Sequence, residues 1–399
     1  MYKEIKLSDE IFYIGVNDRR THLFENMWPL PRGVSYNSFL IKDEKIAVID
    51  TVEAGFLEKW LDKVRTVIGG RNIDYLIINH MEPDHSSAIR FLAELYPEMQ
   101  IIGNRKTMPM VEGYYGIRNN LLEVKEGDVI ELGSTSLSFH PIPMVHWPES
   151  MVCFERKSGT LFSTDAFGSY GTLDGAVFDD EMDFEYFRDE MRRYYSNIVG
   201  KYGNPVQKAL SKLSGLDIKL IAPAHGPLIR ENIEDVIARH DRWSRHETEE
   251  GVIIAYASMY GNTEEMVEVT ARAIAECGIK RIRMYDVSKT HISYIIADVF
   301  KYRGVIMASP TYSNELHPNM EALVMKLQHM GFKNHLFGIL GSYTWAGAAV
   351  NKLYEAGKKL GWEIVGKPVE QKYSLNSEKF QQCIDLGKAM AERLKDFRK

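Results

Sequence analysis

The segment His80-Met81-Glu82-Pro83-Asp84-His85 places four side chains that can bind a metal ion within six residues. It follows the apolar run 75–79, which predicts a short buried strand. Packing does not require so many polar side chains at the end of such a strand. Imidazole and carboxylate donors suit zinc, iron or manganese and argue against a thiolate site. The segment therefore predicts a metal centre.

Three further candidate ligands each come directly after another predicted strand. They are His146, Asp165 and His225. Loops at one edge of a sheet can converge on one point, so these residues can be neighbours of the first segment in space. Together the set has four histidines and three carboxylates, which is more than one tetrahedral ion requires. We therefore expect two metal ions, with one carboxylate bridging them.

Each of these residues alone has an ordinary explanation. A single His146 or His225 would more often be a hydrogen-bonded histidine, and Asp165 could cap the helix that follows it. As a set at strand ends, they favour metal ligation. The sequence leaves the roles of two further residues open. His22 lies either beside the site or on the surface, and Asp50 is either an acceptor for a ligand histidine or a turn residue.

Composition excludes several classes of function. The 399 residues carry a formal net charge of -6 and offer no basic face to a nucleic acid. There is no apolar signal core and no apolar run long enough to cross a membrane, so we expect a cytoplasmic protein without membrane contact. The three cysteines are far apart and form no C-x-x-C pair, which excludes an iron–sulfur or rubredoxin-type site within the chain. Any electrons must come from outside.

The order of predicted elements changes once along the chain. Up to about residue 246 strands outnumber helices and the two are mixed in order, which suggests an α/β sandwich. A polar run at 247–250 follows, and beyond it five strands alternate regularly with helices, as in a doubly wound parallel sheet. The expected domains are residues 1–249 and 250–399.

Three loops after strands of the second domain combine small, hydroxyl and aromatic residues. The loop at 256–265 opens a helix, where N–H groups and hydroxyls can hold a phosphate. It is neither a Walker A loop nor a G-x-G-x-x-G turn, and a plain turn capped by Thr263 is the alternative. The loops at 309–314 and 341–347 add aromatic planes at the sheet edge where ligands bind. An aromatic cleft beside a phosphate cradle fits FMN, and its candidate residues are Ser258, Met259, Tyr260, Gly261, Asn262, Thr263, Ser309, Pro310, Thr311, Tyr312, Asn314, Ser342, Tyr343, Thr344, Trp345 and Gly347.

These motifs together resemble the flavodiiron proteins, also called A-type flavoproteins, over nearly the whole chain. The first half is similar to the metallo-β-lactamase fold, an αβ/βα sandwich whose zinc hydrolases carry H-x-H-x-D-H. Here Glu82 takes the place of the second histidine, which is the flavodiiron variant. The second half resembles flavodoxin. With no rubredoxin or flavin-reductase extension after Lys399, the chain resembles the minimal two-domain class.

The resemblance implies a role for each group of residues. His80, Glu82 and His146 would hold one iron ion, Asp84, His85 and His225 the other, and Asp165 would bridge them. In some members water replaces the residue that matches His85. Ser258, Tyr260, Asn262 and Thr263 would hold the FMN phosphate, and the two later loops would hold the ring. A tyrosine beside the two irons matches Tyr194 or Tyr195, and we take Tyr194, with His22, as the catalytic candidates.

The same resemblance implies a reductase of small gases. It would reduce O2 to water, NO to N2O, or both, with electrons that reach the diiron site through FMN. The donor would be rubredoxin, or a reduced deazaflavin in some relatives, and the chain would form a head-to-tail homodimer or a dimer of dimers. One alternative is a dinuclear zinc hydrolase fused to a flavodoxin domain, which Glu82 argues against. Another is a pure electron carrier, which would leave seven candidate ligands without a purpose.

Overall fold

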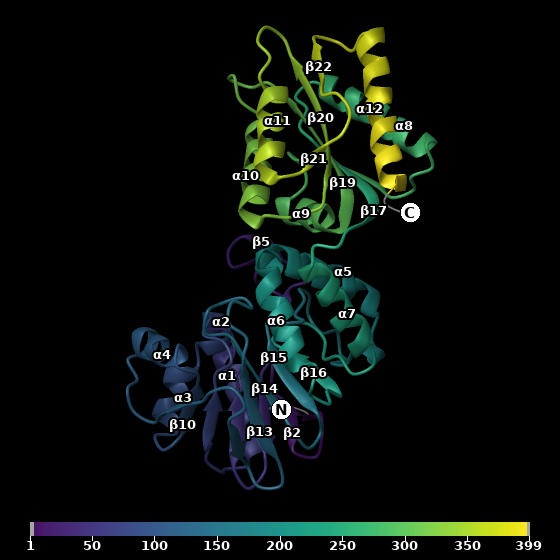
Figure 1. The fold of residues 1–399 in the computed structure, drawn as a ribbon. Coiled ribbons are helices and arrows are strands. Elements are labelled where there is room, and N and C mark those ends of the chain that lie inside the picture. Colours follow the sequence, from purple (N-terminus) through teal and green to yellow (C-terminus); the bar gives the residue numbers. More distant parts are fainter. Residues whose placement is uncertain (1–3, 397–399) are drawn as a thin grey trace. The chain divides into compact units, whose positions relative to one another are not determined.

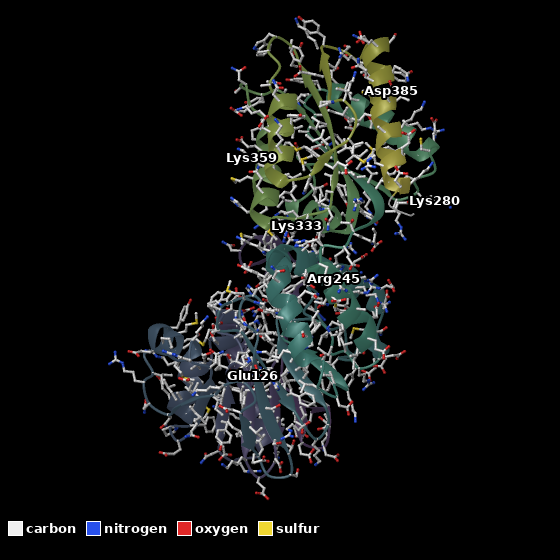
Figure 2. The ribbon with its side chains drawn as sticks, viewed as in Figure 1. Glu126, Arg245, Lys280, Lys333, Lys359 and Asp385 are labelled. Atoms are coloured by element: carbon white, nitrogen blue, oxygen red, sulfur yellow. The ribbon has the colours of Figure 1, made fainter. Side chains whose placement is uncertain are left out.

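The computed structural model describes residues 4–396 of the chain. Those residues form two compact units, and the chain divides between Ser244 and Arg245; Arg245 is labelled in Figure 2. This division comes a few residues before the boundary expected from the sequence, because Glu249 and Glu250 belong to the first strand of the second unit rather than to a polar linker. Each unit is described by itself below.

The first unit contains a seven-stranded sheet of order β1-β2-β7-β8-β9-β10-β11. Strands β8 to β11 run parallel to one another, and the other neighbouring pairs are antiparallel. The bounds of its strands are β1 Ile5–Lys6, β2 Ile11–Tyr13, β7 Phe39–Lys42, β8 Ile46–Ile49, β9 Tyr75–Ile77, β10 Gln100–Gly103 and β11 Leu121–Glu123.

A second, five-stranded sheet of the same unit has the order β12-β13-β14-β15-β16. Its last pair, β15 and β16, is parallel. The strands are β12 Val129–Glu131, β13 Ser136–Pro141, β14 Met151–Glu155, β15 Thr160–Thr164 and β16 Leu220–Pro223. Two short antiparallel ribbons complete the strands of this unit: β3 Val16–Asp18 with β6 Val34–Tyr36, and β4 Leu23–Phe24 with β5 Trp28–Pro29.

The helices of the first unit lie along these sheets and at the ends of their strands (Figure 1). Their bounds are η1 Ala54–Phe56, α1 Leu57–Ile68, α2 Pro83–Ser86, α3 Ile89–Leu95, α4 Thr107–Tyr115, η2 Asp179–Glu181, α5 Phe184–Tyr194, the π-helical turn η3 Tyr195–Val199, η4 Gly200–Tyr202, α6 Gly203–Leu213 and α7 Ile233–Ser244. Two sheets with covering helices match the expected αβ/βα sandwich.

The second unit is built on one parallel sheet of order β18-β17-β19-β20-β21, with β22 also paired to β20. Helices α8 and α12 lie on one side of this sheet, and α10 and α11 lie on the other (Figure 1). This confirms the expected doubly wound fold. The bounds are β17 Glu249–Tyr256, α8 Asn262–Glu276, β18 Ile282–Asp286, α9 Ile292–Lys301, β19 Tyr302–Pro310, α10 Pro318–Met330, β20 Leu336–Tyr343, α11 Ala349–Leu360, β21 Glu363–Ile364, β22 Val369–Lys372 and α12 Ser377–Asp396.

Alternation along the central strands explains how one sheet supports helices on both faces. In β17, Val252, Ile254 and Tyr256 join the core cluster that α8 and α12 complete, while Ile253 and Ala255, equally buried, face the other way. A strand buried on both faces reads as a continuous apolar run. The sequence of β17 has this pattern.

Several elements differ from the sequence-based expectation, among them the strands β11 and β12, which were not expected. The helix expected over 186–199 ends as an α-helix at Tyr194 and continues as the π-helical turn η3. Helices α4 and α6 were not expected, and neither was a sixth strand of the second unit, β22. Among the described residues, no helix combines the length and apolar character needed to cross a bilayer.

Candidate functional site

The candidate metal ligands come from loops that follow strands of the two sheets of the first unit. His80 and Glu82 lie between β9 and α2, and Pro83, the first residue of α2, helps to start the turn that carries Asp84 and His85. His146 lies between β13 and β14, Asp165 directly follows β15, and His225 follows β16. Because β15 and β16 are parallel, their carboxyl ends lie at the same edge. The seven predicted ligands meet there.

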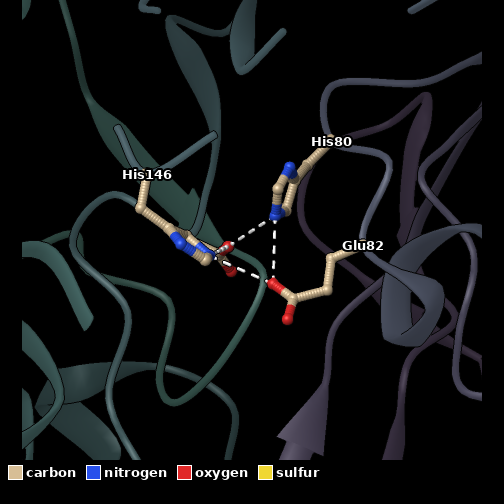
Figure 3. A group of neighbouring side chains, drawn as sticks. His80, Glu82 and His146 are labelled. Carbon is tan, nitrogen blue, oxygen red and sulfur yellow. Dashed lines mark hydrogen bonds and ion pairs between the residues drawn. The ribbon is translucent and has the colours of Figure 1, made fainter. Parts of the chain in front are cut away.

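A first group is formed by His80, Glu82, His146 and Asp165. The Nε2 atom of His80 lies 3.2 Å from Glu82 Oε2, and that of His146 lies 3.0 Å from the same oxygen. Figure 3 shows the three labelled side chains pointing toward one another, with these interactions drawn as dashed lines. Three side chains from two separate loops therefore present donor atoms to one point.

A second group is formed by Asp84, His85 and His225. The Nε2 atoms of His85 and His225 each lie 3.4 Å from Asp84 Oδ2. Both histidines are fully buried. In some flavodiiron proteins water replaces the residue that matches His85. Here the structure places the His85 ring inside this group.

Asp165 lies between the two groups and presents one oxygen to each. Its Oδ2 atom lies 3.1 Å from Nε2 of both His80 and His146. Its Oδ1 atom lies 3.2 Å from His85 Nε2 and 3.4 Å from His225 Nε2. A carboxylate arranged in this way can bridge two metal ions.

Several donor atoms of the cluster are buried and make no hydrogen bond to any described residue. They are both oxygens of Asp84, both oxygens of Asp165, both ring nitrogens of His85, and Nε2 of His225. Buried polar atoms are normally satisfied, and each exception calls for an explanation. Two ligand atoms about 2.1 Å from one ion, a usual metal–nitrogen distance, lie about 3.0 to 3.4 Å apart when they subtend 90 to 110°. The observed spacings fit this arrangement, so the residues present fit two metal ions.

The electrostatics of the cluster favour positive charge where the histidine nitrogens meet. Burial lowers the pKa of His80, but the Asp165 carboxylate outweighs it and raises that pKa well above its ordinary value. Burial raises the pKa of Asp165, but His80 and His85 outweigh it and hold that pKa well below the usual range. The Asp165 carboxylate therefore stays ionised, as metal binding requires.

Two of the histidines are oriented by a hydrogen bond from the other ring nitrogen. His80 Nδ1 lies 2.8 Å from Oε1 of Glu149, which is itself fully buried, and His225 Nδ1 lies 2.8 Å from the carbonyl oxygen of Ser35. Such bonds fix the ring of a ligand histidine. Sequence reasoning missed Glu149, because a single glutamate in a loop carries no spacing signal. Asp50 does not take this role: its carboxylate accepts from the backbone N–H of Asn79 at 2.8 Å and from the Asn79 side chain at 3.2 Å.

Aromatic rings enclose His225. The ring of Phe24, in the β4–β5 hairpin, lies 5.2 Å from it, and that of Tyr194 lies 5.7 Å from it. Tyr194 is buried, whereas His22 is exposed at the start of the hairpin and the contact with the cluster is made by Phe24 instead. Tyr195 turns the other way, against Trp243. Of the two tyrosines considered from the sequence, Tyr194 is the one beside the cluster.

Glu25, also missed from the sequence, approaches the cluster from the same hairpin. Trp28 Nε1 donates to Glu25 Oε2 at 2.8 Å. Burial, together with the nearby Glu82 carboxylate, raises the pKa of Glu25 to about 7. The hairpin thus brings both an aromatic ring and a further carboxyl group to the cluster.

A cleft at the carboxyl edge of the second unit's sheet gathers most of the predicted cofactor residues. Its cavity volume is about 180 Å³. The predicted residues that line it are Ser258, Met259, Tyr260, Asn262, Thr263, Pro310, Thr311, Asn314, Ser342, Tyr343, Thr344 and Trp345. Ligands of open α/β sheets bind at this edge.

Hydrogen bonds within the cleft hold its loops in place. Ser258 Oγ accepts from the N–H of Gly261 at 3.1 Å, and Gly261 adopts a left-handed conformation (φ 93°) just before α8. Thr263 and Ser342 share a hydrogen bond between their hydroxyls at 2.8 Å, which joins the first loop to the third. The cleft therefore opens on the first turn of a 15-residue helix, where backbone N–H groups favour a phosphate. Trp345 (88% exposed) and Tyr260 (93% exposed) supply flat aromatic surface for a flavin ring.

Four predicted cofactor residues lie outside the lining of this cleft: Gly261, Ser309, Tyr312 and Gly347. The hydroxyl of Ser309 is used inside the loop, where it donates to the Pro310 carbonyl and accepts from the N–H of His317. Three lining residues were missed: Ser313, Ala346 and Tyr373. Tyr373 directly follows β22, so recognition of that strand would have found it.

Comparison with protein families gives two matches along the chain. A family described as ODP family beta lactamase matches residues 34–226, and the flavodoxin family matches residues 254–387. The first match contains all seven candidate metal ligands, and the second contains all three loops of the cleft.

Similar proteins cover nearly the whole chain. A nitric oxide reductase of Moorella thermoacetica is 30% identical over 401 residues, which is 99% of this chain and 100% of that protein. The structure is similar to that of rubredoxin oxygen:oxidoreductase from Desulfovibrio gigas, with a TM-score of 0.95, 27% identity and 99% of both chains covered. It is also similar to a variant of a flavo di-iron protein from Thermotoga maritima, with a TM-score of 0.89, 26% identity and 98% of both chains covered.

Proposed function

Because this chain belongs to the flavodiiron proteins, we propose that it reduces O2 to water, NO to N2O, or both, at a non-heme diiron site supplied with electrons through FMN. The observation that carries this proposal is the position of Asp165. One carboxylate faces His80 and His146 with one oxygen and His85 and His225 with the other. This is the arrangement of two metal ions held side by side.

The ligands divide between the two ions as the two groups do. His80, Glu82 and His146 would hold one iron ion and Asp84, His85 and His225 the other, with Asp165 facing both groups. Nitrogen and oxygen donors without thiolate suit iron. A diiron centre held there would supply a binding place for the gas and electrons for its reduction. Reduction of one O2 to two waters takes four electrons and four protons, and reduction of two NO to N2O and water takes two of each.

The protein's own part is to orient the ligands and to control their surroundings. Glu149 fixes the ring of His80, and the Ser35 carbonyl fixes that of His225. Phe24 and Tyr194 cover the His225 side of the cluster and exclude water from it. The Tyr194 hydroxyl is buried and makes no hydrogen bond to a described residue, which leaves it free to donate to a small ligand at the cluster.

FMN would occupy the cleft of the second unit. Ser258, Asn262 and Thr263 lie before and within the first turn of α8 and would hold the phosphate, and Tyr343 and Trp345 line the cleft and would face the ring. The remaining candidates around the ring are Thr311, Tyr312, Asn314 and Ser342.

We extend the proposal to the donor and to the assembly. Rubredoxin supplies the electrons, since the chain has no C-x-x-C pair of its own and the similar Desulfovibrio protein is a rubredoxin oxygen:oxidoreductase.

Two copies pair head to tail. Large exposed side chains border both sites, Trp345 and Tyr260 at the cleft and Met27 and Leu23 on the hairpin beside the metal cluster, and such patches favour burial by a partner. Light scattering that shows a fully active monomer would contradict this pairing.

The dinuclear zinc hydrolase is the weaker alternative. It gives no use to a complete flavin cleft, and it does not explain why a carboxylate, Glu82, stands where zinc hydrolases of this fold carry histidine. The similar proteins named above are oxidoreductases.

Metal content and gas consumption test the proposed function together. We expect protein produced with both metals available to hold two irons and one FMN per chain. Reduced anaerobically through rubredoxin, it should consume O2 or NO, followed with electrodes selective for each gas under the same conditions. Stoichiometric zinc, no iron and no consumption of either gas after FMN reduction would overturn the proposal.

A further inference from the structure

Beside the metal cluster lies a small, partly open cavity. The residues that line it are mostly apolar, and six of the thirteen are Ile142, Val145, Val199, Val206, Ala209 and Leu213. They come from the loop after β13, from the π-helical turn η3 and from α6, and all six are buried. The cavity is therefore an apolar space between the second sheet and the helices over it.

The cavity reaches the cluster at one end. Asp165, which faces both groups of ligands, is part of its lining, and so is Tyr194, whose ring lies 5.7 Å from that of His225. Leu210 of α6 also lines the cavity and is only half-buried. The space thus runs from the bridging carboxylate toward the surface of α6.

Its size and lining select what can occupy it. The cavity volume is about 20 Å³, which is room for one small molecule, because a water molecule needs about 10 to 15 Å³ on the same measure. Apolar cavities of this kind stay dry and take up apolar guests such as xenon. O2 and NO are diatomic, uncharged and weakly polar, so they gain from leaving water for an apolar lining.

We propose that this cavity is a binding site for the diatomic gas substrate, from which the gas passes to the diiron cluster at the Asp165 and Tyr194 end. The inference rests on the proposed function for the identity of the gas. The site itself, a cavity for a small molecule, rests on its lining, which is mostly apolar and also includes Asp165, Tyr194, Tyr195 and His240. Water is the competing occupant, since the Tyr194 hydroxyl and the Asp165 carboxylate could hold one molecule at the inner end.

Crystals pressurised with krypton or xenon test the site without any turnover. Both gases scatter anomalously, and we expect a peak between Ala209, Val206 and Val145 in the complete, FMN-loaded and iron-loaded protein. Hydrogen-bonded water there under pressure, or no gas peak, would overturn the inference. Because this readout does not use catalysis, a protein that bound krypton but reduced neither gas would refute the proposed function and leave the cavity site standing.

A variant that fills the cavity tests the path. Ala209→Leu adds three carbon atoms to the wall, and we expect the KM for the gas to rise several-fold while kcat at saturating gas and the iron and FMN content stay unchanged. Ala238→Leu, the same substitution at an exposed position of α7, is the control and should leave the KM unchanged. An unchanged KM in a correctly folded Ala209→Leu protein would overturn the path, and the noble-gas experiment on the unmodified protein remains decisive if that variant fails to fold.

Discussion

A single buried carboxylate, Glu149, fixes the geometry of the first ligand group. Its Oε1 atom lies 2.8 Å from His80 Nδ1, and the same oxygen accepts from the backbone N–H of Met81 at 3.0 Å. Glu149 thus binds both the ring and the loop that carry the donor atom. Carboxylates in this position also make the histidine a stronger ligand.

Replacing Glu149 with glutamine keeps the shape and removes the charge. We expect Glu149→Gln to weaken iron binding by about 10- to 100-fold, the usual cost of losing such a partner, while the fold and the FMN content are retained. Competition with a chelator, followed by iron analysis, measures this.

Another carboxylate–imidazole pair of the same unit provides a matched control. Glu126, labelled in Figure 2, lies 2.7 Å from His140 Nδ1, but it is half exposed, and neither residue belongs to the ligand set. Surface pairs contribute little, so Glu126→Gln should leave iron affinity unchanged. Equal losses in both variants would show that the effect of Glu149→Gln is not specific to His80.

The ligands themselves could be predicted from the sequence, but the residues that orient them could not. Clustered histidines and carboxylates after apolar runs carry a spacing signal that one chain displays. Glu149 and Phe24 carry none, because each reaches the cluster only through the packing of two loops. The two possibilities for Asp50 could not be separated for the same reason: its carboxylate accepts from the backbone N–H of Asn79, a contact that a sequence does not show.

At the scale of elements, α5 holds the hairpin β4–β5 over the cluster through Arg193. This arginine is 2% exposed and binds Glu190 of its own helix at 3.0 Å. It also donates to the carbonyl oxygen of Pro29 in β5 at 3.0 Å and stacks on the ring of Tyr170 at 4.3 Å. The π-helical turn begins two residues later, and such turns are frequent at functional sites.

Breaking this buried ion pair should be costly. We expect Arg193→Met to lower the free energy of unfolding of the first unit by about 3 to 5 kcal/mol, because Glu190 keeps a buried charge without its partner. Urea denaturation followed by tryptophan fluorescence measures the change. The double variant Arg193→Met with Glu190→Leu should recover most of the loss, since both charges are then absent.

An exposed arginine of the same unit is the control for this change. Arg118 pairs with Glu112 at 2.7 Å, and both side chains are well exposed. Arg118→Met should cost less than about 1 kcal/mol. If it destabilised the unit as much as Arg193→Met, the buried ion pair would not be the cause.

Most elements with strong periodicity could be predicted, and those set by tertiary contacts could not. The run 252–256 is apolar on both faces and was recognised as a strand, although the first residues of β17, Glu249 and Glu250, were placed in the polar run before it. Val369–Lys372 alternates only weakly, and it becomes β22 because β20 offers it a paired edge. The switch from α-helix to π-helix after Tyr194 has no sequence pattern, since the side chains of η3 are all buried and their packing decides the turn.

At the scale of the whole molecule, the chain forms two compact units, so a buried titratable group acts on the stability of its own unit. In the second unit that group is His335, which is 3% exposed and lies 4.6 Å from the Trp362 ring. Its Nδ1 atom donates to the Tyr302 carbonyl at 3.2 Å. Burial, with a smaller contribution from His246 and Arg303, lowers its pKa to about 3.

This lowered pKa predicts how the stability of the second unit depends on pH. The folded unit leaves His335 neutral down to about pH 3, whereas the unfolded chain takes up the proton below about pH 6.5. Protons therefore favour the unfolded chain. As the pH is lowered below 6.5, the free energy of unfolding decreases by about 1.4 kcal/mol per pH unit, which amounts to about 2 kcal/mol at pH 5.

His335→Gln keeps an N–H donor but cannot titrate. The decrease in the free energy of unfolding between pH 7.5 and pH 5 should therefore be smaller in this variant by about 2 kcal/mol. Urea unfolding followed through Trp362 fluorescence and FMN release measures it, with His329→Gln, at an exposed position of α10, as the control. The same fall in stability in the His335→Gln protein as in the unmodified one would show that another group controls the pH dependence.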